Sequence, residues 1–259
     1  MRAPLPAAFL TTPIAHRAYH NRATRRPENS RAAIQAAIEA GYAIEIDLQL
    51  SVDTIAMVFH DEDLGRLTEA SGLVAQHSAA DLGQIKLRDS DEGIPTLAEV
   101  LRLVAGRVPL LIEIKDQTGL MSETDGQLET ATAAELAHYA GPVAVMSFNP
   151  HAIARMARLA PQIARGLTTS AYDPADWAPL PAQTCADLRG IPDYDRALCS
   201  FISHEAADLA FAAAMAAHAR QTFDLVADRR SAMPTATAER LESLARDREA
   251  LITKMESIA

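Results

Sequence analysis

The fold is decided by one stretch, Ile44-Glu45-Ile46-Asp47-Leu48-Gln49-Leu50. Apolar and polar residues alternate strictly here, which is typical of a β-strand whose successive side chains point to opposite faces. Glu45, Asp47 and Gln49 therefore share one face, and the aliphatic residues share the other. Two carboxylates this close repel each other unless a cation or a basic partner relieves them. The stretch is either an exposed hairpin with a polar face or a strand that carries a metal site.

A second, mostly apolar run follows a short turn and reads Ile55-Ala56-Met57-Val58-Phe59-His60-Asp61. We expect it to return along the acidic strand, so that it brings His60 and Asp61 back to the same place. Because imidazole changes its charge near neutral pH, a histidine beside an acidic site is a candidate for proton transfer.

Composition limits the classes of function that the chain can serve. The 259 residues are 49% hydrophobic, which is enough for one large core, and the net charge is −10. An acidic chain is a poor match for a nucleic-acid groove or an anionic membrane surface. Cys185 and Cys199 have no metal-binding spacing, so they are predicted to be reduced thiols. Residues 1–12 lack the apolar core of a signal peptide, and no run reaches transmembrane length, so we expect a cytoplasmic protein without stable membrane insertion.

Short apolar runs alternate with helical patterns along the chain. If the return run is a hairpin arm outside the barrel, eight strands remain, and they alternate with helices as in a parallel (β/α)8 TIM barrel, distorted by the hairpin and the insertion after it. We expect one α/β domain over residues 1–259, with an irregular, charged insertion at 61–95 and a proline-rich excursion at 171–195. The predicted strands are 13–17, 44–50, 109–116, 143–148, 164–169, 198–203, 222–227 and 250–253. The predicted helices are 31–40, 97–105, 127–139, 150–159, 205–220 and 236–247.

In such a barrel, the carboxyl ends of the strands form the active face. Glu45, Asp47 and Glu113 lie near the ends of two of these strands and offer three oxygen donors. Carboxylate donors suit a hard divalent cation, Mg²⁺ or Ca²⁺, with water and substrate completing its shell. The plainer alternative is that the three carboxylates form salt bridges with arginine and lysine.

Four other residues belong to the same predicted site. His16 and His60 are candidates for a proton-transfer pair, and Arg17 and Lys115 would supply positive charge to a phosphate. The alternatives are structural histidines, a surface arginine and a strand-end lysine. His20 follows His16 by four residues, but its spacing does not fix its place. The other histidines are predicted to be surface or capping residues: His77, His138, His151, His204 and His218.

Six motifs occur in an order and spacing that resemble the glycerophosphodiester phosphodiesterase family. The resemblance extends from about residue 13 to residue 203, and six ordered motifs are far more specific than one. The motifs are Ile14-Ala15-His16-Arg17, Pro27-Glu28-Asn29-Ser30, Ile44-Glu45-Ile46-Asp47, Phe59-His60-Asp61, Ile112-Glu113-Ile114-Lys115 and Ser147-Phe148.

The resemblance implies a distorted TIM barrel that hydrolyses glycerophosphodiesters to sn-glycerol 3-phosphate and an alcohol. By similarity, the carboxylates would bind the divalent metal ion, the histidines would act as general base and acid, and Arg17 and Lys115 would hold the phosphate. In the family mechanism a glycerol hydroxyl attacks phosphorus first, and water then opens the cyclic product.

The sequence departs from the family pattern at two places. Ala18 follows His16-Arg17 where the family usually has glycine, at a cost of about 1 kcal/mol if this position needs a positive φ. Residues 205–259 diverge from the family, and the sole tryptophan, Trp177, lies outside the position where the family carries one. Two other functions stay open: a barrel that binds metal and phosphoester but is catalytically impaired, and a metal-dependent sugar isomerase.

Overall fold

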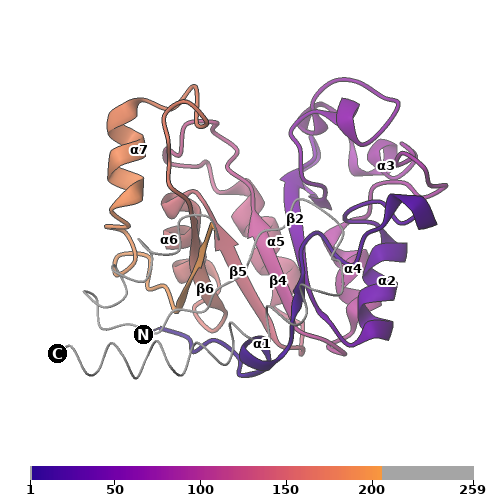
Figure 1. The fold of residues 1–259 in the computed structure, drawn as a ribbon, viewed down its shortest axis with the longest axis horizontal. Helices are drawn as coiled ribbons and strands as arrows, with labels where there is room; N and C mark the ends of the chain where they lie inside the picture. Colours follow the sequence, from indigo (N-terminus) through magenta and orange to yellow (C-terminus); the bar gives the residue numbers. More distant parts are fainter. Residues whose placement is uncertain (1, 206–259) are drawn as a thin grey trace.

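The computed structural model describes residues 2–205, which form a curled sheet flanked by helices (Figure 1). The sheet has seven strands in the order β1-β2-β4-β5-β6-β7, all parallel, with β3 antiparallel to β2. The strands are β1 Ile14–Ala15, β2 Ala43–Leu50, β3 Ala56–Val58, β4 Leu110–Ile114, β5 Val143–Ser147, β6 Ala164–Thr169 and β7 Phe201–His204. The predicted α/β barrel class and the hairpin return are confirmed. The strands predicted at 222–227 and 250–253, and the helices at 205–220 and 236–247, lie outside the described residues, apart from Glu205.

The helices begin and end largely where the capping signals place them. Ser30 accepts a hydrogen bond from the Ala33 amide at the start of α2, and Gly41 ends that helix with φ 72°. Thr96 forms a capping box with Glu99 at the start of α4. The helices are α1 Ala8–Thr11, α2 Arg31–Ala40, α3 Ala79–Leu82, α4 Leu97–Val104, α5 Gln127–Leu136, α6 Pro150–Leu159 and α7 Ala182–Arg189. Within residues 2–205, no helix combines the length and the apolar character needed to cross a bilayer.

Strand alternation divides the core into two parts. The outward-facing residues of the sheet, such as Ile46 and Ile112, pack against the helices in the largest hydrophobic cluster. The inward-facing residues near the strand starts, such as Leu111, form a second cluster that contains Phe9 of α1. The inward face therefore has an apolar floor below its polar upper part. Glu45 and Asp47 are fully buried, so the interpretation of this stretch as an exposed hairpin is wrong.

Two segments contain more structure than the sequence predicts. The insertion at 61–95 holds two short 3-10 helices, η2 Leu64–Arg66 and η3 Val74–Gln76, as well as α3. Its apolar residues and two residues of the return run form a separate cluster, the insertion core, whose buried members are Met57, Phe59, Leu64, Leu67, Val74, Leu82, Leu87 and Ile94. The proline-rich excursion at 171–195 contains the whole of α7. Both segments lie at the end of the sheet away from α1 (Figure 1).

Candidate active site

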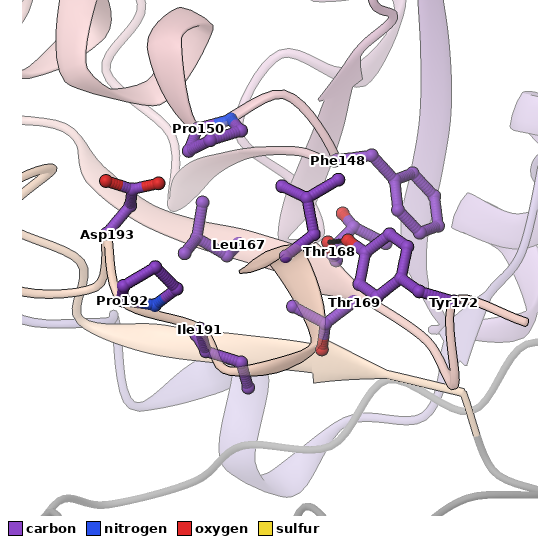
Figure 2. A pocket seen from close by; sticks show the side chains of 10 residues that line it. Phe148, Pro150, Leu167, Thr168, Thr169, Tyr172, Ile191, Pro192 and Asp193 are labelled. Carbon is purple, nitrogen blue, oxygen red and sulfur yellow. Dashed lines mark hydrogen bonds between the residues drawn. The ribbon is translucent and has the colours of Figure 1, made fainter. Parts of the chain in front are cut away.

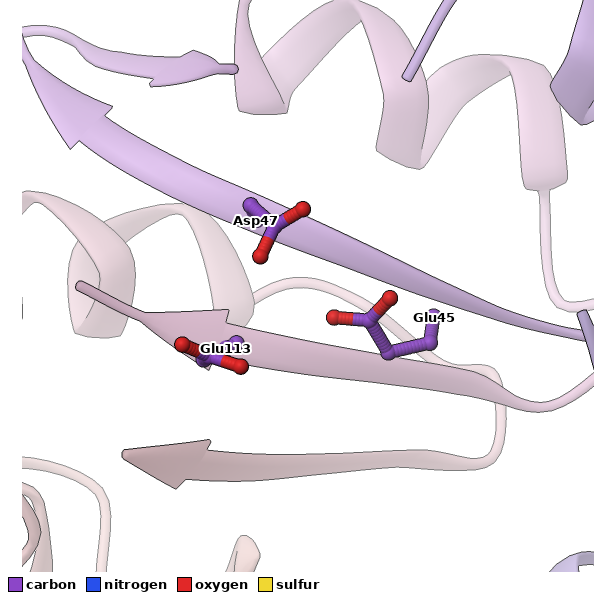
Figure 3. Close-up of side chains that lie close together, drawn as sticks. All are labelled: Glu45, Asp47 and Glu113. Carbon is purple, nitrogen blue, oxygen red and sulfur yellow. The ribbon is translucent and has the colours of Figure 1, made fainter. Parts of the chain in front are cut away.

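Three carboxylates from adjacent strands meet on the inward face of the sheet. Glu45 and Asp47 belong to β2, and Glu113 is the register partner of Asp47 on β4. All three are buried, and one oxygen of each lies within 4.8 Å of the others (Figure 3). A cation bound at about 2.3–2.6 Å from two oxygens can bridge a separation of about 5 Å. The trio therefore has the spacing of a divalent-metal site.

The hydrogen bonding of these carboxylates leaves an oxygen available. Glu45 Oε2 accepts a hydrogen bond from the Arg17 amide at 2.8 Å, whereas Glu45 Oε1 is buried without a donor. Asp47 Oδ1 is also buried, and its partner is the Lys115 ammonium at 2.7 Å. Because a buried carboxylate oxygen without a partner is costly, Glu45 Oε1 suits a hard cation. The donor set fits Mg²⁺ or Ca²⁺, as the sequence predicts.

The pKa values of the three carboxyls shift in different directions. Burial, reinforced by repulsion from Asp47 and Glu113, raises the pKa of Glu45 well above its ordinary value. Burial also raises the pKa of Glu113, against the attraction of Lys115. At Asp47, burial is outweighed by Lys115, His60 and Arg17, which hold its pKa well below the ordinary value. Asp47 is therefore the carboxyl of the trio that most readily stays ionised, and Glu45 is the one that most readily takes up a proton.

Lys115 lies between two members of the trio. Its Nζ is 2.7 Å from Asp47 Oδ1 and donates a hydrogen bond to Glu113 Oε1 at 2.6 Å. Burial by itself would lower the pKa of Lys115, but these carboxylates outweigh it and raise the pKa. The predicted phosphate-binding lysine is thus a fixed positive charge beside the carboxylates.

A tight turn after β1 brings Arg17 to the same place. Arg17 and Ala18 have φ of 52° and 65°, so two successive residues adopt the left-handed conformation. This turn directs the Arg17 amide to Glu45 Oε2 and the Ala18 amide to the Glu45 carbonyl, at 2.8 and 2.9 Å. Ala18 therefore meets the condition under which its departure from glycine carries a conformational cost.

The Ala18 conformation gives a prediction about stability. Glycine there relieves about 1 kcal/mol of backbone strain but removes a buried methyl group worth about 0.8 kcal/mol. We expect Ala18→Gly to change the free energy of unfolding by less than about 0.5 kcal/mol. Ala18→Val should destabilise the protein by about 1–3 kcal/mol, because a β-branched residue tolerates this conformation poorly. Urea denaturation measures both, and a stable Ala18→Val variant would contradict the assignment of strain.

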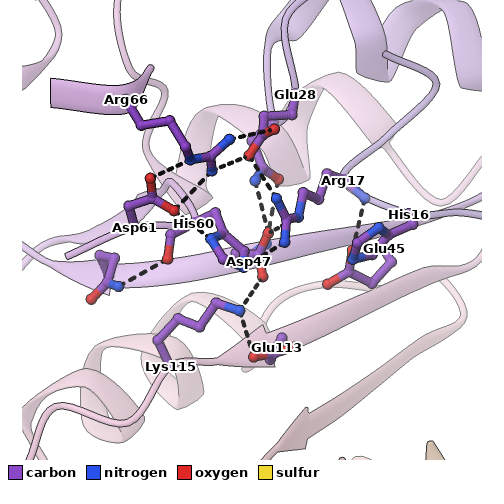
Figure 4. A network of polar contacts seen from close by, with 12 residues as sticks. His16, Arg17, Glu28, Glu45, Asp47, His60, Asp61, Arg66, Glu113 and Lys115 are labelled. Atoms are coloured by element: carbon purple, nitrogen blue, oxygen red, sulfur yellow. Dashed lines mark hydrogen bonds and ion pairs between the residues drawn. The ribbon is translucent and has the colours of Figure 1, made fainter. Parts of the chain in front are cut away.

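Around His60, five side chains form a closed circuit of polar contacts, which we call the polar ring (Figure 4). Arg17 contacts His60 Nε2 at 2.6 Å and Glu28 at 3.0 Å, and His60 Nδ1 contacts Asp61 at 2.6 Å. Arg66 completes the ring by binding both Asp61 and Glu28. Asp61 and Glu28 stand in the sequence motifs, but no pattern indicated Arg66 as a site residue.

The remaining predicted site residue, His16, also reaches the trio. His16 Nε2 lies 3.9 Å from Glu45 Oε2. The structure thus brings all seven predicted residues together, and it adds Asn29, whose amide donates to Asp47 Oδ2 at 2.9 Å. The prediction that His204 is a surface or capping residue is wrong: it is buried at the end of β7, with Nδ1 2.7 Å from Thr169 Oγ1.

The polar ring has a consequence for acid stability. Although burial opposes it, the hydrogen bonds from His60 and Arg66 hold the pKa of Asp61 well below the ordinary value of about 4. Below that ordinary value the unfolded chain binds a proton that the folded protein does not, so lowering the pH favours unfolding. When the pH falls from 6 to 3, the free energy of unfolding of Asp61→Asn should decrease by about 1 kcal/mol less than that of the unmodified protein. This figure allows for solvent screening. Urea denaturation at several pH values tests this, and parallel curves would contradict it.

An aromatic cluster lies on the β5 and β6 side of the site. The rings of Phe148, Tyr172 and Trp177 pack together with centroid separations of 4.8–6.4 Å. Phe148 and Tyr172 also line a small hollow between β6 and the α7 segment (Figure 2). Burial, followed by the nearby charge of Glu113, raises the pKa of the Tyr172 hydroxyl. Trp177, the sole tryptophan, therefore belongs to this aromatic cluster.

Comparisons with known proteins agree with this geometry. Residues 16–222 match the model of the glycerophosphoryl diester phosphodiesterase family. A glycerophosphodiester phosphodiesterase of Caldanaerobacter subterraneus is 29% identical over 54% of this chain, and one of Bacillus altitudinis is 30% identical over 62%. The matched stretches span 60% and 67% of the lengths of these two relatives.

A solved structure supports the same fold. A phosphodiesterase of Oleispira antarctica, in complex with the product sn-glycerol-3-phosphate, has a TM-score of 0.69 and 25% sequence identity. The match covers 94% of this chain and 92% of that one.

Proposed function

The chain belongs to the glycerophosphoryl diester phosphodiesterase family, and on this premise we propose that it is a metal-dependent phosphodiesterase. Its substrates would be glycerophosphodiesters, cleaved to sn-glycerol 3-phosphate and an alcohol. The single observation that supports this best is the buried trio Glu45, Asp47 and Glu113, in which Glu45 Oε1 has no hydrogen-bond donor. The trio lies beside two histidines, an arginine and a lysine.

The trio would hold Mg²⁺ or Ca²⁺. Such a cation would lower the pKa of an attacking hydroxyl and offset charge on the phosphoryl oxygens. Arg17 and Lys115 would bind the non-bridging oxygens of the phosphate, because both place positive charge beside the trio. Their carboxylate partners fix these cations in place before the substrate arrives, which lowers the cost of organising the site.

His16 and His60 would carry the protons. One would accept the proton of the attacking glycerol hydroxyl, and the other would give a proton to the departing alcohol. In the second stage, water would open the cyclic phosphate with the two roles reversed. The two histidines come from separate segments, His16 from the end of β1 and His60 from the β3 return, so each can have its own role.

The direct experiment measures release of glycerol 3-phosphate from glycerophosphocholine. We expect turnover with added Mg²⁺ or Ca²⁺, loss of turnover in EDTA, and recovery when excess metal is returned. Unchanged turnover in EDTA would contradict metal dependence. Metal binding by calorimetry without any turnover would favour a catalytically impaired binding protein, and turnover of an uncharged sugar alone would favour an isomerase.

A further inference from the structure

Arg66 enters the site from the insertion at 61–95, and its backbone is held on both sides. It ends η2, and the neighbouring Leu64 and Leu67 are buried in the insertion core. The Arg66 carbonyl accepts a hydrogen bond from Arg88 Nε at 3.1 Å. The guanidinium of Arg66 is therefore presented to the barrel from a fixed base (Figure 4).

The Arg66 guanidinium binds two carboxylates at once. Nε and Nη2 donate to Asp61 at 2.5 and 2.8 Å, and Nη1 and Nη2 donate to Glu28 at 3.1 and 2.7 Å. The planar fork of arginine matches two carboxylates in this way, whereas a lysine ammonium offers one point charge. Despite burial, the hydrogen bond and charge of Arg66 help to hold the pKa of Glu28 below its ordinary value.

Each of these carboxylates contacts one residue of the proposed machinery. Asp61 meets His60 Nδ1, and Glu28 accepts from Arg17 Nη1. Arg17 Nη2 lies 2.6 Å from His60 Nε2. Because a guanidinium can only donate, Nε2 is the acceptor in this arrangement, and Nδ1 carries the proton given to Asp61. The carboxylates thus set both the tautomer of His60 and the direction of Arg17.

We propose that Arg66 is a positioning residue for phosphodiester hydrolysis, which orients His60 through Asp61 and Arg17 through Glu28. The inference rests on the proposed function. This role of Arg66 would make the insertion part of the catalytic apparatus, because a residue of the insertion would then hold His60 in its orientation. The insertion has a separate hydrophobic core. Displacement of an aligned group by about 1 Å can cost about 10²-fold in rate.

The first test compares Arg66→Met with Arg22→Met. Arg22 is an exposed arginine that pairs with Asp89 outside the polar ring, so it is a matched control. We expect Arg66→Met to lower kcat by about 10- to 100-fold while metal affinity stays within about threefold, and Arg22→Met to leave both unchanged. Arg66→Lys should recover part of the loss, because it retains the charge but not the fork. Full activity of Arg66→Met would overturn the proposal.

A double-mutant cycle separates positioning from general support of the fold. If Arg66 acts through His60, Arg66→Met should cost much less in the His60→Ala background than in the unmodified protein. An equal loss in both backgrounds would refute the orientation of His60 by Arg66 through Asp61.

A readout independent of turnover keeps this proposal distinct from the proposed function. The ¹⁵N spectrum of the imidazoles should show His60 as the Nδ1-protonated tautomer in the unmodified protein and as a mixture in Arg66→Met. A protein without turnover that still shows this change would contradict the proposed function but support the role of Arg66. An unaltered His60 spectrum in Arg66→Met would overturn that role.

Discussion

Glu45→Gln should fold normally, bind Mg²⁺ or Ca²⁺ at least about 10-fold more weakly and lose about 10³-fold or more in turnover. Glutamine keeps the shape of the side chain and can still accept from the Arg17 amide, but it removes the anionic oxygen that has no donor. A bound metal contributes several kcal/mol to stabilisation of the transition state, and each 1.36 kcal/mol is worth tenfold in rate. Calorimetry and the glycerol 3-phosphate assay measure the two effects.

Folding should survive this change because of the pKa of Glu45. Burial and repulsion from Asp47 and Glu113 raise the pKa of Glu45, so a neutral glutamine avoids the cost of burying a charge at this position. Asp47→Asn should behave differently, because its pKa is lowered and the charge of Lys115 would lose one of two partners. We expect Asp47→Asn to destabilise the protein by up to about 3 kcal/mol.

The control for the metal measurements is Glu129→Gln. Glu129 is a buried carboxyl on α5 that accepts a hydrogen bond from Thr124, and its variant should retain metal binding and activity. Unchanged metal affinity in Glu45→Gln would contradict the metal site.

The second large effect is expected at the two histidines. His16→Ala and His60→Ala should each lower the rate by about 10²–10⁴, which is the usual contribution of a positioned acid or base. Metal affinity should change little, because neither histidine belongs to the carboxylate trio. His138→Ala, which alters an exposed histidine beyond α5, should keep full turnover. Near-normal rates in either site variant would show that its proton-transfer role is wrong.

A change of leaving group separates the acid from the base. An alcohol of low pKa leaves without a proton, so a substrate carrying one should restore the first step in the variant that lacks the general acid. The variant that lacks the general base should stay slow with both substrates. Equal losses with the two substrates in both variants would contradict the division of roles between His16 and His60.

The parts of the fold that sequence analysis predicted correctly carry a local physical signal. Alternation at 44–50 predicts β2 to within one residue, and the predicted bounds of α2 and α6 agree with the structure to the residue. No such signal exists for α7, whose single buried residue is Cys185, so its pattern has no apolar face. The insertion core was missed for a related reason: its apolar residues are scattered over nearly forty positions without a period.

The candidate site divides in the same way. Strand alternation and the barrel rule were sufficient to place the carboxylates and Lys115 on one face, because a strand fixes the direction of each side chain. Arg66 and Glu28 are 38 residues apart and meet only through the packing of the insertion, which no local pattern encodes. The burial of His204 has no local signal, because a single histidine after Phe201-Ile202-Ser203 carries no sign of whether it lies inside or at the surface.

The position of Lys115 has a practical consequence for handling the protein. The Lys115 ammonium group, directly after the end of β4, is a counter-ion that is covalently part of the chain. Dilution or dialysis of the sample therefore cannot remove it. A chelator that strips divalent ions from the solution leaves this charge in place beside Asp47 and Glu113. We therefore expect the fold to survive purification in EDTA, so that one chosen divalent ion can be added afterwards.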